Sequence, residues 1–540
     1  MKLTYNRLLC LATALCLLLG LALGCSGTAK EQATAASGEN TAQDQSQGEQ
    51  TPADMPAGAP PEGSSDSMPN GTPPEGFPGG FSGGTPPEGF GGTKPNGTPP
   101  DGFNGGSMPN GTPPGGFGGG MGQPPSGGMP GGGPGGNASD LTYSGAVEIT
   151  SADAQSGQIY ASDTADQSAL LISTSETVTV SDPTVTKSGS SDGGDSCNFY
   201  GLNAAVLVKD GADVTITGGS VVSDASGANG VFCYGGNGGR NGAAGDGTTL
   251  TIRDTVITTA GDGSGGIMTT GGGTTYAYDL TVTTSGRSSA PIRTDRGGGT
   301  VYVDGGTYTS NGLGSPAIYS TAQIQVANAT LISNLSEGVC IEGKNSIELT
   351  NCDLTASNTQ MNSNATFLDT IMIYQSMSGD ADSGTSTFTM TGGKLTSKSG
   401  HVFHVTNTNA VITLSGATLV NEDGERVLLS VCDDGWSGAG NVAALNAKGQ
   451  ILEGLLLVGS DSTLTLNLTE GSVFTGTVSG RITNAKGDVV SSEVGTVNVT
   501  LDASSTWTLT ADTYIASFTG DAANVIANGY TLYVNGVALT

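Results

Sequence analysis

A repeated turn position constrains the fold of this chain more than any other feature of its sequence. In nine successive segments the same position is occupied by Gly, Asn or Asp, the residues that best tolerate a left-handed backbone. The positions two residues before and three residues after this turn residue are apolar in all nine segments. The turn residues are Asp182, Gly218, Asp254, Asp279, Gly305, Asn328, Asn351, Gly392 and Gly416.

The spacing of these turns predicts a solenoid. Most neighbouring turn residues are about 24 residues apart, and three wider intervals leave room for loop insertions. Since side chains alternate between the two faces of a strand, a repeat of this length fits one coil of three short strands. Each coil buries its apolar face only by stacking on the next. We therefore expect an all-β domain of about twelve coils over residues 141–540, with caps within 141–177 and 505–540.

The same pattern resembles the right-handed parallel β-helix of pectate-lyase-like and autotransporter-passenger proteins. In that family an Asn-bearing turn separates two strands of each coil, and Asn328 and Asn351 occupy this position here. The segments Ser289–Gly299 and Ser315–Ser320 look like those of adhesin-type bacterial surface β-helices. The resemblance covers residues 141–540. It implies the fold but no single activity, because the fold hosts lyases, hydrolases, adhesins and binding proteins.

The N-terminus carries the pattern of a bacterial lipoprotein signal. Lys2 and Arg7 precede an uncharged, largely apolar run that ends at Gly24, directly before Cys25. This ending resembles the lipobox, except that Ala22 stands where the motif usually has Leu. The resemblance implies a signal peptide over residues 1–24 and a lipid on Cys25. We expect a membrane-anchored protein on the surface of a bacterium, of the Gram-positive type; ordinary secretion is the alternative.

Residues 25–140 are expected to form a disordered tether. Between residues 51 and 140 the chain has 29 Gly and 20 Pro, a composition that cannot support a packed core. A Thr-Pro-Pro motif followed three residues later by Phe recurs four times, ending at Phe77, Phe90, Phe103 and Phe117. The simplest role for this segment is to hold the folded domain away from the membrane. The regularly spaced Phe residues could alternatively be binding elements.

Charge and composition exclude several classes of protein. The net charge is −30, so a nucleic-acid partner is excluded, and acidic polymers are repelled unless a local basic patch or a cation intervenes. Two His and five widely spaced Cys after residue 25 favour neither a transition-metal site nor a disulfide framework. We expect no cofactor. The segment Asp380–Gly384 resembles the start of a calcium loop but lacks the closing Glu, so calcium has only weak support.

The remaining strand of each coil is the expected ligand-bearing face. We align its inward side chains as Val231, Ile267, Ile292, Ile318 and Ile341. The outward residues would then form an exposed row that mixes aromatic rings with charges, a combination suited to sugar rings. The candidate ligand-binding residues are Phe232, Tyr234, Arg293, Asp295, Tyr319, Glu342 and Lys344, to which the next coil can add Met372 and Tyr374. Ordinary solvent-exposed surface is the alternative, and the Thr-rich faces are expected to carry no comparable mixture.

The sequence predicts no catalytic residue. Lyases of the resembled family need calcium-binding acids and a base, and no acidic cluster stands beside Arg293 and Arg296. Hydrolases of that family use convergent Asp residues, whereas Asp433 and Asp434 are expected to form a solvated turn. His401 and His404 are three apart, which places them on opposite faces of a strand and argues against a shared metal.

These observations favour a lipid-anchored surface β-helix that is adhesin-like or carbohydrate-binding and does not catalyse a reaction. Its expected partners are the membrane, through the lipid, and a cell-wall glycan, host glycan or protein surface. A polysaccharide lyase or glycoside hydrolase of the same fold is one alternative, and a structural cell-wall spacer is another. Carboxylates converging near Arg293 would favour the enzyme, and a flat groove with exposed aromatic rings would favour binding.

Overall fold

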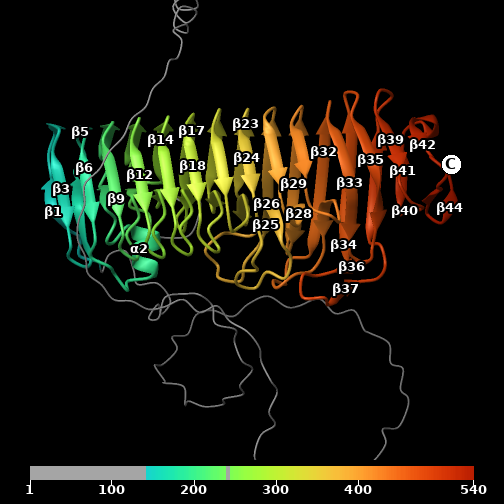
Figure 1. The fold of residues 1–540 in the computed structure, drawn as a ribbon, viewed down its shortest axis with the longest axis horizontal. Helices are drawn as coiled ribbons and strands as arrows, with labels where there is room; N and C mark the ends of the chain where they lie inside the picture. The colour runs from blue at the N-terminus through green and yellow to red at the C-terminus, as the bar shows by residue number, and fades with distance from the viewer. Residues whose placement is uncertain (1–140, 239–243, 540) are drawn as a thin grey trace, which may run out of the picture. The chain divides into compact units, whose positions relative to one another are not determined.

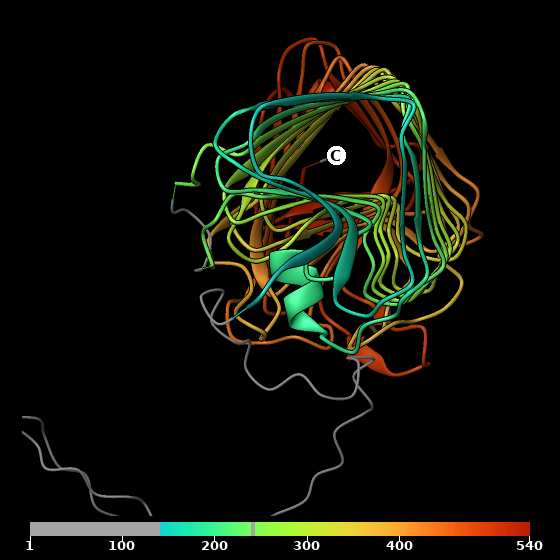
Figure 2. The same cartoon turned by 90° about the vertical axis from the view of Figure 1, so that its left-hand side faces the viewer.

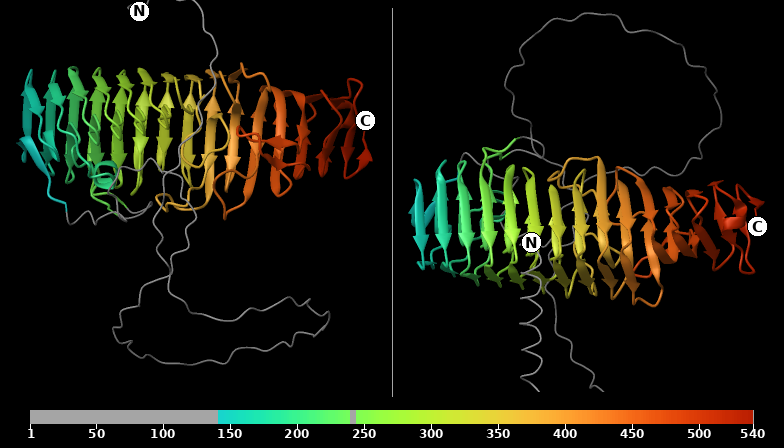
Figure 3. Two further views of the ribbon diagram at one scale, coloured as in Figure 1. Left: turned by 60° about the horizontal axis from the view of Figure 1, so that its bottom comes forward. Right: turned by 90° about the horizontal axis from the view of Figure 1, so that it is seen from above.

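Three long parallel β-sheets wind around one apolar core (Figure 1). The computed structural model describes residues 141–238 and 244–539. Strands from the three sheets follow one another along the chain, so each coil contributes one strand to each sheet. The views down and across the coils show the same stacked arrangement (Figures 2 and 3). The predicted parallel β-helix is thereby confirmed.

Sheet A has fifteen strands and runs along the whole solenoid. Its strands are β1 (Ser144–Ile149), β4 (Gln167–Ser173), β7 (Val206–Lys209), β10 (Val231–Tyr234), β13 (Ile267–Thr270), β16 (Ile292–Thr294), β19 (Ile318–Ser320), β22 (Val339–Glu342), β25 (Asp369–Tyr374), β28 (His401–Thr406), β31 (Val427–Val431), β33 (Ile451–Val458), β35 (Val473–Ser479), β39 (Thr506–Leu509) and β42 (Val525–Ile526).

Sheet B has fourteen strands. They are β2 (Asp153–Ser156), β5 (Thr177–Ser181), β8 (Asp213–Thr217), β11 (Thr249–Arg253), β14 (Gly273–Tyr278), β17 (Gly299–Asp304), β20 (Gln323–Ala327), β23 (Ser346–Thr350), β26 (Thr385–Thr391), β29 (Thr408–Ser415), β32 (Asn441–Lys448), β34 (Ser462–Thr469), β38 (Thr496–Leu501) and β41 (Ser517–Thr519).

Sheet C has ten strands and ends at residue 421. They are β3 (Ile159–Ser162), β6 (Thr184–Lys187), β9 (Ser220–Ser223), β12 (Val256–Thr259), β15 (Thr281–Thr284), β18 (Thr307–Ser310), β21 (Thr330–Ser333), β24 (Asp353–Ala356), β27 (Lys394–Ser397) and β30 (Thr418–Asn421). Ten coils therefore have all three strands, and the later coils return from sheet B directly to sheet A.

Short elements complete the domain. Helix α2 (Asp195–Tyr200) lies outside the coils (Figure 2), and a hairpin of β36 (Ile482–Thr483) and β37 (Val489–Ser491) lies between β35 and β38. A small sheet of β40 (Thr513–Ile515), β43 (Leu532–Val534) and β44 (Val537–Ala538) and the 3-10 turn η2 (Ala522–Asn524) lie near the C-terminus. Residues 144–162, expected to belong to an N-terminal cap, already form the first full coil.

The turn column and the core columns predicted from the sequence are both present. All nine turn residues have a positive φ, from 49° at Asp182 to 77° at Gly305, and they connect sheet B to sheet C. The apolar residues two positions before and three positions after them are buried, except for Leu419, which is partly buried. Hydroxyl groups from Ser264, Ser289 and Ser315 connect neighbouring coils by accepting backbone N–H groups at 2.9 Å.

Candidate functional site

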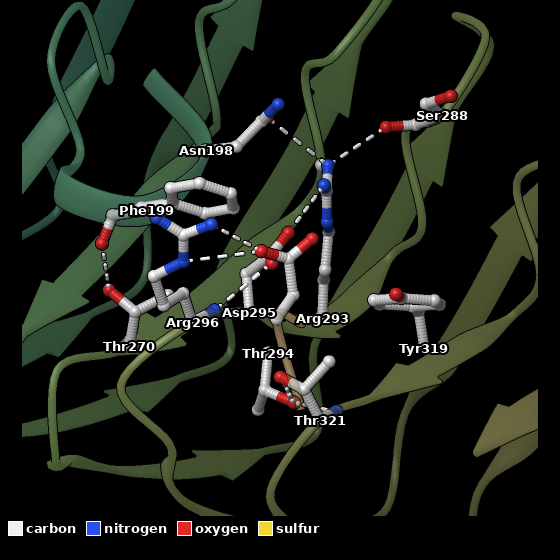
Figure 4. A network of polar contacts seen from close by, with 12 residues as sticks. Asn198, Phe199, Thr270, Ser288, Arg293, Thr294, Asp295, Arg296, Tyr319 and Thr321 are labelled. Atoms are coloured by element: carbon white, nitrogen blue, oxygen red, sulfur yellow. Dashed lines mark hydrogen bonds and ion pairs between the residues drawn. The ribbon is translucent and has the colours of Figure 1, made fainter. Parts of the chain in front are cut away.

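The outer face of sheet A is covered near the N-terminus rather than exposed. Residues 188–205, including α2, pack on this face and form a second apolar cluster with Leu171, Leu207 and Met268. The Thr270 hydroxyl donates to the Phe199 carbonyl at 2.6 Å and holds the helix in place (Figure 4). Phe232 and Tyr234 point outward as predicted but belong to this cluster, with 0% and 4% exposure. The prediction that they are exposed is wrong, because the length of an insertion does not reveal where it packs.

The strand register differs from the predicted one at β22. Ile318 pairs with Val339 and Tyr319 with Cys340, so Ile341 lies one inward position further along. Cys340, and not Glu342, is therefore the strand partner of Tyr319, and Glu342 pairs with Tyr374 in the next coil. Lys344 lies beyond the end of β22 and forms an ion pair with Asp382 at 2.8 Å. The shift of two residues keeps every predicted inward or outward direction within the strand but moves Glu342 and Lys344 to other columns.

Two arginines form a connected charge network at the edge of α2 (Figure 4). Arg293 donates to Asp295 at 2.7 Å, to the Ser288 carbonyl at 2.9 Å and to the Asn198 side chain at 3.3 Å. Arg296 pairs with Asp380 at 2.5 Å and stacks on Phe199, 4.2 Å from the ring centroid. Burial raises the pKa of Asp295 to about 6, and Arg293 counteracts that rise. Asp380 and Asp382 thus pair with two different cations, which is not the arrangement of a calcium loop.

Glu342 is the centre of a second polar cluster. Its carboxylate accepts the hydroxyls of Tyr319 at 2.6 Å and Tyr374 at 3.1 Å, and it also accepts the hydroxyl of Ser376. The side chain is buried, with 2% exposure, and this burial raises the pKa of Glu342 although the hydroxyl donors act to lower it. The two tyrosine rings are thereby fixed on the outer face of sheet A.

A hollow opens on the outer face of sheet A beside the insertion of residues 357–368, and we call it the sheet A pocket. It consists of two adjoining cavities of about 290 and 260 Å³, which share Tyr319, Tyr374 and Asn362 in their linings. Arg293 lines the first cavity, and Glu342 and Trp436 line the second. The rings of Tyr374 and Trp436 are 4.9 Å apart. The pocket therefore has aromatic walls, an arginine on one side and a hydrogen-bonded carboxylate in its base.

Side-chain hydrogen bonds hold the insertion beside the pocket at its middle and near its C-terminal end. Arg287 donates to the Asn362 side chain at 2.8 Å. Asp434 accepts the backbone N–H of Thr366 at 2.7 Å and its hydroxyl at 2.6 Å. The side chain of Asp434 is fully buried beside His404, at 3.3 Å from Nε2. Asp434 is therefore not part of a solvated turn, and that prediction is corrected.

His401 and His404 meet at one hydroxyl. Both Nδ1 atoms lie 2.7 Å from the Ser430 hydroxyl oxygen. The Ser430 hydroxyl therefore connects the two imidazole rings through one hydrogen bond to each. The prediction of opposite faces fails because His401 is the first residue of β28 and follows Gly400, where φ is 73°. A residue at that turn does not follow strand alternation.

The described residues support neither a metal site nor a membrane-spanning helix. Among residues 141–238 and 244–539, no three His, Cys, Asp or Glu side chains are placed to hold a metal ion. Within the same ranges no helix is long and apolar enough to cross a membrane. All five cysteines of the described domain are buried and free, as expected for core fillers.

The sequence identified part of this site. Arg293, Asp295, Tyr319, Glu342 and the added Tyr374 do come together, although the charged members are buried. Trp436 was missed because it lies in the loop after β31, outside the predicted column of strand residues. Trp436 could have been identified as a candidate, because it is an aromatic residue in an insertion that follows the ligand-bearing strand. No protein-family model, curated protein or solved structure matches the chain in comparisons with known proteins.

Proposed function

We propose that this protein is a lipid-anchored bacterial surface β-helix, pectate-lyase-like in fold and adhesin-like in role, that binds carbohydrate in the sheet A pocket without cleaving it. The observation that carries the proposal is the meeting of Tyr319, Tyr374 and Trp436 with Arg293 and Glu342 in one open hollow. Aromatic faces pack on the apolar faces of sugar rings, and fixed polar groups select hydroxyl positions. A protein surface is the other kind of partner for this role.

The hydrogen bonds of the pocket favour binding over catalysis. Glu342 already accepts three hydroxyls, and both oxygens of Asp295 are engaged, by the Arg293 side chain and by the backbone N–H of Arg296. A general acid or base needs a free path to the proton that it transfers. These carboxylates instead fix the positions of rings and guanidinium groups around the hollow.

A polysaccharide lyase or glycoside hydrolase is the second candidate. Glu337 and Glu342 both line the pocket, and burial raises the pKa of each carboxyl group. A raised pKa is typical of a general acid. Analysis of products after incubation with each bound glycan separates the two candidates, since a binding protein returns the glycan intact.

The anchor and the tether complete the proposal, although both lie outside the described residues. Cleavage before Cys25 and lipidation of its thiol would attach the chain to the membrane. Residues 25–140 would then extend the β-helix outward to a cell-wall or host glycan. A structural wall spacer would share this anchoring but would bind no glycan in the sheet A pocket.

A glycan array probed with the full chain tests the proposed function. Tyr319→Ala should weaken binding of any positive glycan about tenfold or more, because it removes a central aromatic wall and a donor to Glu342. Thr413→Ala, on the outer face of sheet B, is the control and should change nothing. Thermal melting of each variant checks folding. Absence of binding to every glycan, or binding that Tyr319→Ala leaves unchanged in a folded protein, contradicts the proposal.

A further inference from the structure

A second hollow lies on the outer face of sheet B, and we call it the tyrosine groove. It has a volume of about 310 Å³ and lies along β14, β17, β20 and β23. Its polar and aromatic walls are formed by Tyr276, Tyr278, Tyr302, Asp304, Gln325 and Glu348. No ligand site was predicted here, because the Thr-rich faces were expected to carry no comparable mixture of aromatic rings and charges. The tyrosines interrupt that surface over two coils.

The geometry of the rings leaves one aromatic face free. Tyr276 and Tyr302 pair across β14 and β17 and stack at 5.1 Å with an interplanar angle of 8°. The other face of Tyr302 is directed toward the next coil, where Gln325 is its strand partner. Two residues further along the same strands, Asp304 pairs with the small Ala327, and both residues line the groove. At the opposite end, the guanidinium of Arg253 stacks on Tyr278 at 3.8 Å.

We propose that the tyrosine groove binds the Thr-Pro-Pro repeat carried by the N-terminal segment of a neighbouring copy of this chain. Aromatic grooves recognise proline-rich segments because the fixed φ of proline pre-organises an extended polyproline II conformation. The chain itself contains four such segments, at residues 72–77, 85–90, 98–103 and 112–117. These proline-rich segments are potential ligands within the chain itself, and the proposed carbohydrate binding assigns them no binding role.

The dimensions of the groove fit a short stretch of this repeat. Four neighbouring coils span three intervals, or about 14 Å, along the solenoid axis. Five residues of polyproline II are about 15 Å long. Proline rings would pack on the free face of Tyr302. The unpaired carbonyls of the extended backbone would accept hydrogen bonds from tyrosine hydroxyls and the Gln325 amide.

Arg253 does not line the groove but stacks on Tyr278, which does, and from there it would add a charge-specific contact. Three of the four repeats carry an acidic residue after Pro-Pro, at Glu75, Glu88 and Asp101, and the fourth has Gly115. Within the described residues Arg253 forms a ring contact but no ion pair, so its guanidinium is available to a carboxylate. The Gly115 repeat is therefore a natural control for this contact.

The ratio of repeats to grooves is compatible with binding between neighbouring copies. Each chain carries four repeats and, on the described face of sheet B, one tyrosine groove. Four ligands and one receptor on the same chain allow a single molecule to reach several neighbours. Copies crowded on one surface gain further from the high effective concentration of tethered partners. The expected result is a cross-linked array of β-helices.

Photo-crosslinking between two isotopic forms of the full chain tests the proposal. One form carries benzoylphenylalanine in place of Phe77, and the other is labelled with 15N and is otherwise unmodified. We expect crosslinks from position 77 to β14, β17 and β20 of the labelled form. Tyr302→Ala in the labelled form should reduce their yield at least fivefold. Tyr514→Ala is the matched control, since Tyr514 stacks on Tyr533 at 4.7 Å in a similar exposed pair.

Each remaining outcome decides the proposal as well. Arg253→Ala should lower crosslinking from position 77 but leave unchanged that from position 117, whose repeat has no acid. Crosslinks confined to one isotopic form, or a yield that Tyr302→Ala does not change, would overturn the assignment. Displacement of the crosslink by a neutral oligosaccharide, with Tyr302→Ala abolishing sugar binding, would make the groove a glycan site instead. Circular dichroism verifies that Tyr302→Ala is folded, as expected for a side chain that is 36% exposed.

Discussion

At the scale of single residues, backbone sterics made the turn column predictable. A left-handed backbone is strained for most side chains, so evolution fills the position with Gly, Asn or Asp, and the pattern is visible without a structure. All nine residues identified in this way have a positive φ. Strand alternation, in contrast, predicted the wrong direction for the His401 side chain. The turn that precedes His401 sets the direction of this residue. Alternation therefore does not predict the side-chain direction of a residue at the first position of a strand, directly after a turn.

Gly305 provides a test of the turn column. Its φ is 77°, where a β-branched side chain is strained, so Gly305→Val should lower the free energy of unfolding by more than 1 kcal/mol. Gly305→Asn is the matched control and should cost much less, since Asn328 and Asn351 occupy the same column with φ of 55° and 52°. Urea unfolding of both variants measures the difference. Equal destabilisation by Val and Asn would show that crowding, not backbone strain, limits this position.

His401 should make the domain sensitive to acid. Burial lowers the pKa of His401 to about 3, and His404 lowers it further whereas Asp423 and Asp434 act in the opposite direction. The unfolded chain takes up this proton near pH 6.5, so stability is lost as pH falls from about 6.5 toward 3. His401→Gln should reduce the slope of unfolding free energy against pH by up to about 1.4 kcal/mol per unit in this range. Urea titrations from pH 7 to 4 measure the slope, and an unchanged slope contradicts the prediction.

At the scale of elements, the strands were predictable and the insertions that cover them were not. Strand positions follow from apolar periodicity, which is a local property of the sequence. The packing of α2 over Phe232 and Tyr234 depends on contacts between residues more than thirty positions apart. The same holds for the candidate site. Strand alternation predicted that Arg293 and Tyr319 lie on one face, but it could not predict that a neighbouring insertion encloses them.

Asp434 is expected to control the position of the 357–368 insertion. Burial acts to raise its pKa, but hydrogen bonds from His404, Thr366 and Gly435 prevail and lower it. Asp434→Ala would leave His404 and the Thr366 N–H without an acceptor, at a cost of about 2–4 kcal/mol. Hydrogen exchange should then accelerate across residues 357–368.

Asp433→Ala serves as the neighbouring control. Asp433 is exposed and accepts one hydrogen bond from Asn441 at 2.6 Å, so its loss should have little effect on unfolding or exchange. If Asp434→Ala leaves exchange across the insertion unchanged, Asn362 and Arg287 alone are sufficient to hold it. That result would assign the packing of the insertion to its middle, at Asn362.

At the scale of the whole molecule, stacking explains why coils of different lengths share one core. The apolar cluster runs from Ile149 to Leu532, and each coil contacts mainly its neighbours. Insertions are tolerated because they leave at corners and do not interrupt the columns. Sheet C nevertheless ends at Asn421, and the later coils consist of one strand of sheet A and one strand of sheet B. The repeat spacing predicted about twelve coils, whereas sheet A has fifteen strands, since the last ones lack the regular turn pattern.

Lipid anchoring is the prediction that determines where the whole molecule acts. Only the thiol of Cys25 can carry the expected lipid, because no other Cys follows the apolar N-terminal run directly. Cys25→Ala should therefore move the protein from the detergent phase to the aqueous phase, or leave its precursor unprocessed. Cys197→Ala is the control, since that thiol is buried in the folded domain and burial raises its pKa to about 11. If Cys25→Ala still partitions into detergent at the mature size, then another feature holds the chain at the membrane. The proposed array of neighbouring β-helices would then lose the anchor that concentrates its members.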